Sequence, residues 1–261
     1  MPNLTTQQKA ERIVALFRER RQTDVLPREL YPADLEDAYA IRTQFQAIEE
    51  KGGRGPIAGW KIAITTKVMQ ELCGIDEPCY GAIFESEVFR RRAELRAADY
   101  CRLGIETEIA VRLGADLPEG GSRAAVGEAV ESAMAAIELI EDLRYDYKRI
   151  EAPAIVAGNA WNAGIVLGEP QRHWRALDLA TVRGSLRING HEVGTGLGGD
   201  VMGHPLNALS WLANKLAAAG TPLRAGMVVM TGSIVSTRFP VVGDEVEVEI
   251  SGLGRAGLAL A

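Results

Sequence analysis

The chain has few of the features that mark secreted, membrane or nucleic-acid-binding proteins. Its 261 residues include three cysteines, Cys73, Cys79 and Cys101, and no Cys-x-x-Cys pair, so a disulfide framework is not expected. No stretch approaches the roughly 18 consecutive apolar residues of a membrane span. The first ten residues lack the apolar core of a signal peptide. We therefore expect a cytoplasmic protein.

Basic residues and histidines are also sparse. Lys and Arg number 29 against 35 Asp and Glu, for a net charge of −6, and no long basic run appears. This balance argues against nucleic acid and anionic membranes as partners. The three histidines, His173, His191 and His204, form no His-x-x-x-His pattern and no Ser-His-Asp arrangement, which disfavours zinc and a hydrolytic triad. His204 precedes an expected helix, and both a capping role and proton transfer are open to it.

The order of elements predicts an α+β fold. Residues 5–21 and 33–50 carry apolar side chains every three or four positions, as amphipathic helices do, and the glycine-rich segment 51–56 ends this pattern. We predict a helical region over 1–55 and a strand-rich domain over 56–261. The expected strands are 57–64, 104–113, 136–142, 154–167, 182–194, 226–235 and 245–250. Helices are expected over 122–135 and 205–219, and Asn189-Gly190 predicts a tight hairpin. Crossover helices are too few for a doubly wound sheet.

Two acidic segments are the main candidates for chemistry. Alternation in the strand 104–113 places Glu106 and Glu108 on one face, about 6–7 Å apart along the chain. Glu138 lies in a second strand, and it can face the first two if the strands pair. Three carboxylates at one place repel unless a proton or a cation lies between them, and such oxygen ligands suit Mg²⁺ or Mn²⁺. An ordinary solvated strand face is the alternative.

Other candidates are ambiguous on their own. Lys61 lies inside an apolar strand, where it either extends to solvent or binds an anionic substrate. Thr231-Gly232-Ser233 ends a strand, either as a plain turn or as a carboxylate-binding loop. Residues 194–199 match Gly-x-Gly-x-x-Gly, but no helix opens at the third glycine, so a flexible loop or lid is favoured over nucleotide binding. Cys79 is also a possible catalytic thiol.

Several motifs together resemble the fumarylacetoacetate hydrolase superfamily, in the branch of 2-hydroxypentadienoate (2-keto-4-pentenoate) hydratases and oxalocrotonate decarboxylases. They run in family order from about residue 30 to the C-terminus. They are Gly59-Trp60-Lys61-Ile62, Gly74-Ile75-Asp76-Glu77-Pro78, Glu106-Thr107-Glu108-Ile109-Ala110, Ala136-Ile137-Glu138-Leu139-Ile140, Asn159-Ala160, Gly164-Ile165-Val166-Leu167-Gly168, Gly203-His204-Pro205-Leu206-Asn207-Ala208, Trp211-Leu212-Ala213-Asn214-Lys215-Leu216 and Thr231-Gly232-Ser233.

The resemblance implies a mixed β-roll with an N-terminal helical region, assembled as a homo-oligomer. It implies that Glu106, Glu108 and Glu138 bind Mg²⁺ or Mn²⁺. It also implies that Lys61 lies near the substrate as a catalytic residue, and that Thr231, Gly232 and Ser233 receive a 2-oxo acid.

The chain departs in two stretches from the pattern that the resemblance implies. Cys79 stands where an Asp follows the proline in related hydratases. Trp161 and Asn162 stand where they tend to have Ser-Ser. Cys79 and Asn162 are therefore expected in the substrate site without an acid–base carboxylate or a hydroxyl, and a water activated by the ion is then the expected base.

The expected activity is hydration of a 2-hydroxy-2,4-dienoate through a metal-stabilised enolate. Decarboxylation of a 2-oxo-enedioate and C–C hydrolysis of an acylpyruvate need the same stabilisation and stay open. So does a non-catalytic oxo-acid binder or a partner subunit.

Overall fold

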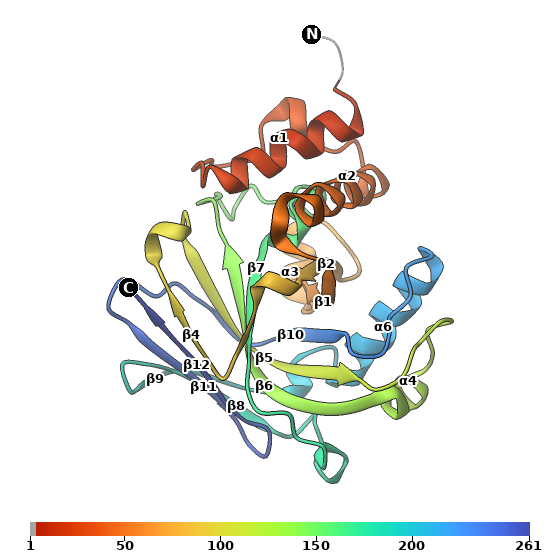
Figure 1. Cartoon of the computed structure of the whole chain (residues 1–261), viewed down its shortest axis with the longest axis vertical. Coiled ribbons are helices and arrows are strands. Elements are labelled where there is room, and N and C mark those ends of the chain that lie inside the picture. Colours follow the sequence, from red (N-terminus) through yellow and green to blue (C-terminus); the bar gives the residue numbers. More distant parts are fainter. Residues whose placement is uncertain (1–3) are drawn as a thin grey trace.

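Two β-sheets form the body of the computed structural model, which describes residues 4–261 (Figure 1). The larger sheet has the strand order β2-β1-β10-β5-β6-β7-β3, and the smaller has the order β4-β12-β11-β8-β9. The strands are β1 Ile57–Ala63, β2 Cys79–Phe84, β3 Val88–Arg90, β4 Arg92–Leu95, β5 Leu103–Leu113, β6 Val130–Glu141, β7 Asn162–Leu167, β8 Arg183–Ile188, β9 His191–Leu197, β10 Val228–Arg238, β11 Glu245–Ile250 and β12 Gly254–Leu260. Parallel and antiparallel pairs occur in both sheets. The α+β mixed-sheet prediction is confirmed.

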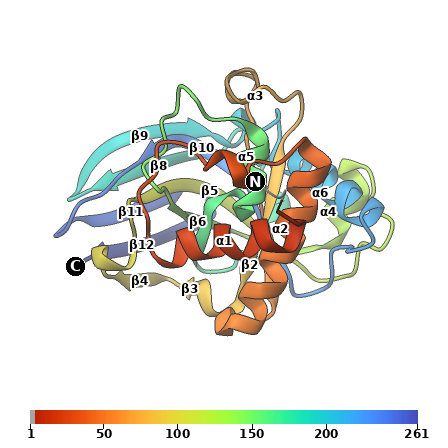
Figure 2. The same cartoon turned by 90° about the horizontal axis from the view of Figure 1, so that it is seen from above.

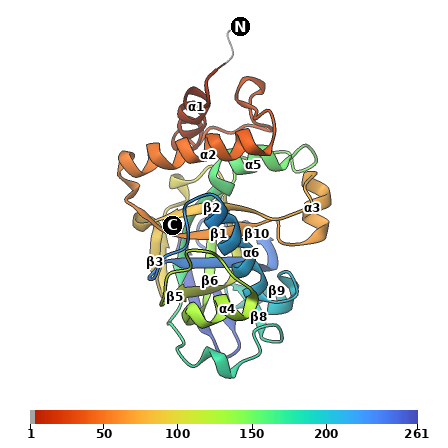
Figure 3. The same ribbon diagram turned by 90° about the vertical axis from the view of Figure 1, so that its right-hand side faces the viewer.

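The N-terminal helices lie over one end of the sheets, with α5 beneath them (Figures 2 and 3). The helices are α1 Thr6–Arg18, α2 Leu35–Glu49, α3 Lys67–Cys73, α4 Arg123–Ala129, α5 Ala152–Ala157 and α6 Pro205–Ala218. The first two begin where the sequence provides caps. The Thr5 hydroxyl accepts the backbone N–H of Gln8, and the Asp34 carboxylate accepts that of Asp37.

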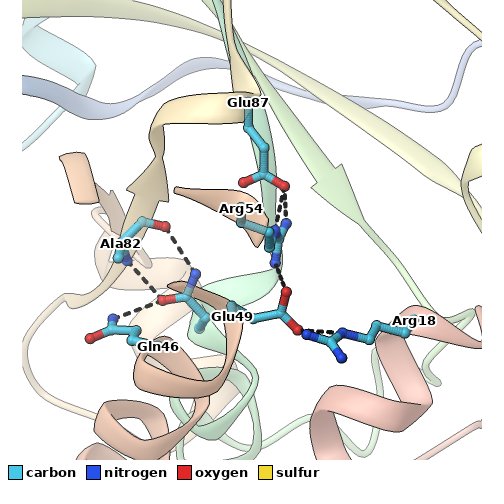
Figure 4. Close-up of polar contacts among 7 residues, drawn as sticks. Arg18, Gln46, Glu49, Arg54, Ala82 and Glu87 are labelled. Carbon is cyan, nitrogen blue, oxygen red and sulfur yellow. Dashed lines mark hydrogen bonds and ion pairs between the residues drawn. The ribbon is translucent and has the colours of Figure 1, made fainter. Parts of the chain in front are cut away.

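Two hydrophobic cores hold these layers together. The larger core lies among the strands, α4 and α6. The second joins α1 and α2 to residues between 140 and 161. The same helices are also tied to the sheets by ion pairs (Figure 4). Glu49 contacts Arg18 and Arg54, and Arg54 also contacts Glu87 just before β3. A domain boundary near residue 55 stays a prediction.

Three expectations about local structure were wrong. The helix expected over 122–135 ends at Ala129, because residues 130–135 extend β6 and pair with β5. The strand expected over 154–167 begins only at Asn162, after α5 and a short 3₁₀ turn, Asn159–Trp161. Residues 194–197 of the glycine-rich segment lie in β9 rather than in a loop, paired with β8. In the first two cases pairing or packing with distant residues outweighs the local pattern, and in the third the Asn189-Gly190 hairpin extends the strand through the glycines.

The Asn189-Gly190 hairpin is confirmed, since the two residues link the paired strands β8 and β9. Within residues 4–261, no helix is both long enough and apolar enough to cross a bilayer.

Candidate metal centre and substrate cavity

Glu106, Glu108 and Glu138 converge at the centre of the larger sheet. Strands β5 and β6 are antiparallel, and their register places Glu106 directly opposite Glu138. Each glutamate offers one carboxylate oxygen, and these three atoms lie within 4.8 Å of one another. A divalent ion with oxygen ligands at about 2.0–2.6 Å can bridge atoms at this separation. The convergence expected from the sequence is therefore present in the fold.

The environment of the cluster fits a bound cation. Glu108 and Glu138 are fully buried. Oε1 of Glu108 and Oε2 of Glu138 have no hydrogen-bond partner among the described residues. Buried carboxylate oxygens are rarely left without a partner. Burial, followed by the charge of Glu138, raises the pKa of both Glu106 and Glu108, because so many negative charges in a dry place repel.

Lys61 contributes one positive charge to this cluster. Its Nζ lies 2.9 Å from Oε1 of Glu138, and its side chain is only 3% exposed, so the lysine does not extend to solvent. Burial acts to lower the pKa of Lys61, but the carboxylates of Glu138 and Glu106 outweigh burial and raise this pKa. One ammonium group balances the charge of one of the three carboxylates, so the cluster can bind a further cation. The amide Nδ2 of Asn162 donates to the same Glu138 oxygen at 3.3 Å.

The Thr231-Gly232-Ser233 segment lies within β10 beside the cluster, and not at the end of a strand as expected, because β10 continues to Arg238 in its pairing with β5. The backbone N–H of Gly232 donates to Oε2 of Glu108 at 2.8 Å, where the strand register shifts. The hydroxyl of Ser233 donates to the carbonyl of Val235 at 2.6 Å, and Ser233 lines the adjacent cavity. The hydroxyl of Thr231 is buried and donates to the carbonyl of Ile109, so it points into the sheet. A substrate-binding role for these residues stays a prediction.

Cys79 is fully buried at the start of β2, opposite Ala63 of β1. Burial raises the pKa of the Cys79 thiol to about 12, although Lys61 acts to lower it. The thiol is therefore neutral at physiological pH and does not replace a carboxylate as a base. Cys79 does not line the cavity described below.

A left-handed turn places Trp161 and Asn162 beside the cluster. Asn159, Ala160 and Trp161 all have positive φ angles, of 56°, 51° and 58°. Such backbone persists only where the surroundings hold it in place. Asn159 provides this support, because its amide pairs with both backbone groups of Ala82 at 2.8 and 2.9 Å and accepts from Gln46 at 2.9 Å.

A cavity of about 360 Å³ opens from the carboxylate cluster. Sequence reasoning missed several of its lining residues. Thr237, four residues after Ser233 on β10, donates its hydroxyl to Glu106. Asp200 also lines the cavity, and its Oδ2 accepts the backbone N–H of Leu197 at 2.8 Å. The polar residues at the end of β10 were a signal for Thr237, whereas nothing local pointed to Asp200.

Comparisons with known proteins show what the whole chain is similar to. The family model described as fumarylacetoacetate (FAA) hydrolase C-terminal matches residues 77–258. The 2-hydroxyhexa-2,4-dienoate hydratase of Comamonas testosteroni is 34% identical over 227 residues, which are 86% of this chain and 85% of that protein. The 2-keto-4-pentenoate hydratase of Paraburkholderia xenovorans is 32% identical over 255 residues, or 96% and 94% of the two chains.

A solved structure matches nearly the whole chain. The 4-oxalocrotonate decarboxylase of Pseudomonas putida G7, complexed with magnesium and adipate, superposes with a TM-score of 0.90 at 26% identity, covering 99% of both chains.

Proposed function

The chain belongs to the fumarylacetoacetate hydrolase family, and from that premise we propose that it is a metal-dependent hydro-lyase that adds water to a 2-hydroxy-2,4-dienoate. The observation that carries this proposal is the cluster of Glu106, Glu108 and Glu138, with two buried carboxylate oxygens unpartnered among the described residues, at one end of a cavity. The 2-hydroxyhexa-2,4-dienoate hydratase and the 2-keto-4-pentenoate hydratase, at 34% and 32% identity, support the choice of reaction.

The three glutamates would hold Mg²⁺ or Mn²⁺, because hard divalent ions prefer carboxylate oxygens. When bound, such an ion acts as a Lewis acid on a 2-oxo acid and favours negative charge on its 2-oxygen. The matching decarboxylase was solved with magnesium, which supports this choice of ion.

The chain's own residues would bind and orient the substrate. Lys61 lines the cavity and brings positive charge next to the substrate carboxylate, while its bond to Glu138 keeps the ammonium in place. The Ser233 hydroxyl, which donates to the carbonyl of Val235, can accept a hydrogen bond at the same end. Thr237 and the N–H of Gly232 fix the orientation of Glu106 and Glu108. Cys79 and Asn162 do not line the cavity and would act on the substrate indirectly, Asn162 through its hydrogen bond to Glu138.

A proton must move to the far end of the diene before water adds. Cys79 is neutral and lies off the cavity, so it does not suit this role. Asp200 is a cavity carboxylate outside the proposed metal ligands, and we infer that it carries the proton.

Turnover of 2-hydroxypenta-2,4-dienoate, followed by the loss of its ultraviolet absorbance, tests the proposal. We expect turnover with Mg²⁺ and none in excess EDTA. Glu106→Gln should remove metal-dependent turnover while the fold persists. Glu131→Gln is the matched control, because Glu131 lies on β6 like Glu138 but pairs with the exposed Arg172. Full activity of Glu106→Gln, or of the native protein in EDTA, would rule the scheme out.

Decarboxylation of a 2-oxo-enedioate is the second candidate, because the decarboxylase structure matches 99% of the chain. Release of carbon dioxide from such a substrate, without hydration of any dienoate, would favour it. Binding of oxo acids without turnover would instead indicate a non-catalytic binder. Assembly as a homo-oligomer stays a prediction, which light scattering of the purified protein tests.

A further inference from the structure

The lining of the cavity comes from two different parts of the fold. Four of its polar residues, Lys61, Glu106, Ser233 and Thr237, lie on the strands β1, β5 and β10. A second group of lining residues belongs to the core that the N-terminal helices share with residues 140–161, or packs against it. This apolar wall consists of Ile64, Met69, Ile140, Ile150, Ile155 and Trp161. A substrate whose carboxyl end lies at the cluster would therefore place its far end against hydrocarbon.

Aromatic contacts hold Trp161 of the apolar wall in place. The indole ring of Trp161 stacks on Tyr145 with ring centroids 4.8 Å apart and planes 2° from parallel. Tyr147 meets the same indole edge-on at 6.3 Å. The left-handed turn that carries Trp161 is held by Asn159, as described above. Aromatic rings fixed in this way favour apolar ligands by contact and do not reorganise to solvate a charge.

Positive charge is scarce around the cavity. Among residues 4–261, the lining includes no arginine and no histidine, and its lysine is Lys61, which pairs with Glu138. The other charged lining residues are Glu106 and Asp200, both acidic.

The buried ion pair behind Tyr147 of the lining is already engaged. Arg102 pairs with the buried Asp142 and lies over the ring of Phe239, with 4.3 Å from its guanidinium carbon to the ring centroid. The hydroxyl of Tyr147 donates to the same Asp142 at 3.0 Å. Nε1 of Trp161 is buried and unpartnered within residues 4–261, but one neutral donor does not replace a cation. A second carboxylate on the substrate would therefore lose its hydration without gaining a counter-charge.

We propose that the substrate is a monocarboxylate whose far end is an uncharged alkyl or aryl tail, and that the site discriminates against a terminal carboxylate. This inference rests on the proposed function, because it assumes that the carboxyl end lies at the cluster. A volume of about 360 Å³ lies near the lower end of small-molecule sites, roughly 300–1,000 Å³, so the tail is short.

Calorimetric titration of the full-length, Mg²⁺-loaded protein tests this proposal without relying on turnover. The probes 2-oxohexanoate and 2-oxoadipate have six carbons each and differ at the far end, a methyl group against a carboxylate. We expect 2-oxohexanoate to bind at least tenfold more tightly. Along 2-oxobutanoate, 2-oxopentanoate and 2-oxohexanoate, affinity should rise about fourfold per buried methylene, which is about 0.8 kcal/mol each.

The outcomes separate the two proposals. If pyruvate binds only with Mg²⁺ but 2-oxoadipate binds as tightly as 2-oxohexanoate, the tail inference is wrong and the proposed site stands. If none of these acids binds in the presence of Mg²⁺, both proposals are overturned.

A pair of substitutions on α3 gives a second measurement. Met69→Arg places a cation in the apolar wall and should weaken 2-oxohexanoate binding while strengthening that of 2-oxoadipate, reversing or cancelling the preference. Val68→Arg is the control, because Val68 is the preceding residue, is 74% exposed and does not line the cavity. It adds the same charge and should leave both affinities unchanged. Equal effects of the two variants would contradict the proposal.

Discussion

Replacement of Asn159 by alanine tests whether one buried amide holds the strained turn beside the site. The substitution removes three hydrogen bonds, two to the backbone of Ala82 and one to Gln46. A buried hydrogen bond contributes about 1 kcal/mol, and the partners left behind are buried and lose more than that. Alanine is also less tolerant than asparagine of a left-handed backbone, by about 1 kcal/mol. We therefore expect Asn159→Ala to lower the free energy of unfolding by about 4 kcal/mol.

The control for this experiment is Asn214→Ala. Asn214 also makes three hydrogen bonds, to both backbone groups of Gly121 and to the carbonyl of Ser210, but it is exposed on α6. Water can replace those bonds, and alanine favours a helix, so the loss should stay below about 1 kcal/mol. Urea denaturation of both variants gives the comparison.

Activity provides a second readout of the same change. The turn carries Trp161 into the cavity wall and Asn162 to Glu138, so folded Asn159→Ala should lose turnover while Asn214→Ala should not. Equal losses of stability in the two variants would refute the assignment of Asn159 as the support of this turn.

Three further predictions concern charge at and near the site. Lys61→Met leaves Glu138 without its cation, so the free energy of unfolding in EDTA should fall by about 3–5 kcal/mol. In Mg²⁺ the fall should be clearly smaller; an equal fall in both solutions would contradict a site that Lys61 and the ion share. Burial raises the pKa of Glu141 to about 7, above its value in the unfolded chain. The free energy of unfolding should therefore decline as the pH rises from about 4.5 to 7, by at most about 3 kcal/mol. Glu141→Gln should flatten that decline in urea denaturation measured across this range, and an unchanged slope would show that another group causes it. Asp200→Asn should reduce turnover of the dienoate about 100-fold or more while 2-oxohexanoate still binds; unchanged turnover would exclude Asp200 as the proton carrier.

Features that depend on neighbours in the chain were predictable from the sequence. Glu106 and Glu108 share a face because successive side chains alternate along any strand, whatever the strand pairs with. The caps at Thr5 and Asp34 and the Asn189-Gly190 turn are also set by side chains within a few residues. The ordered set of motifs then indicated the family.

Features that depend on partners far along the chain were decided by the tertiary structure. The register of β5 against β6 places Glu138 opposite Glu106, and only that pairing brings the carboxylates together. Residues 130–135 are strand because β5 offers them hydrogen bonds, although their apolar spacing also suits a helix. The left-handed turn before Asn162 depends on Gln46 and Ala82, which lie 113 and 77 positions from Asn159. No local pattern encodes such contacts, because they depend on how segments far apart in the chain pack together.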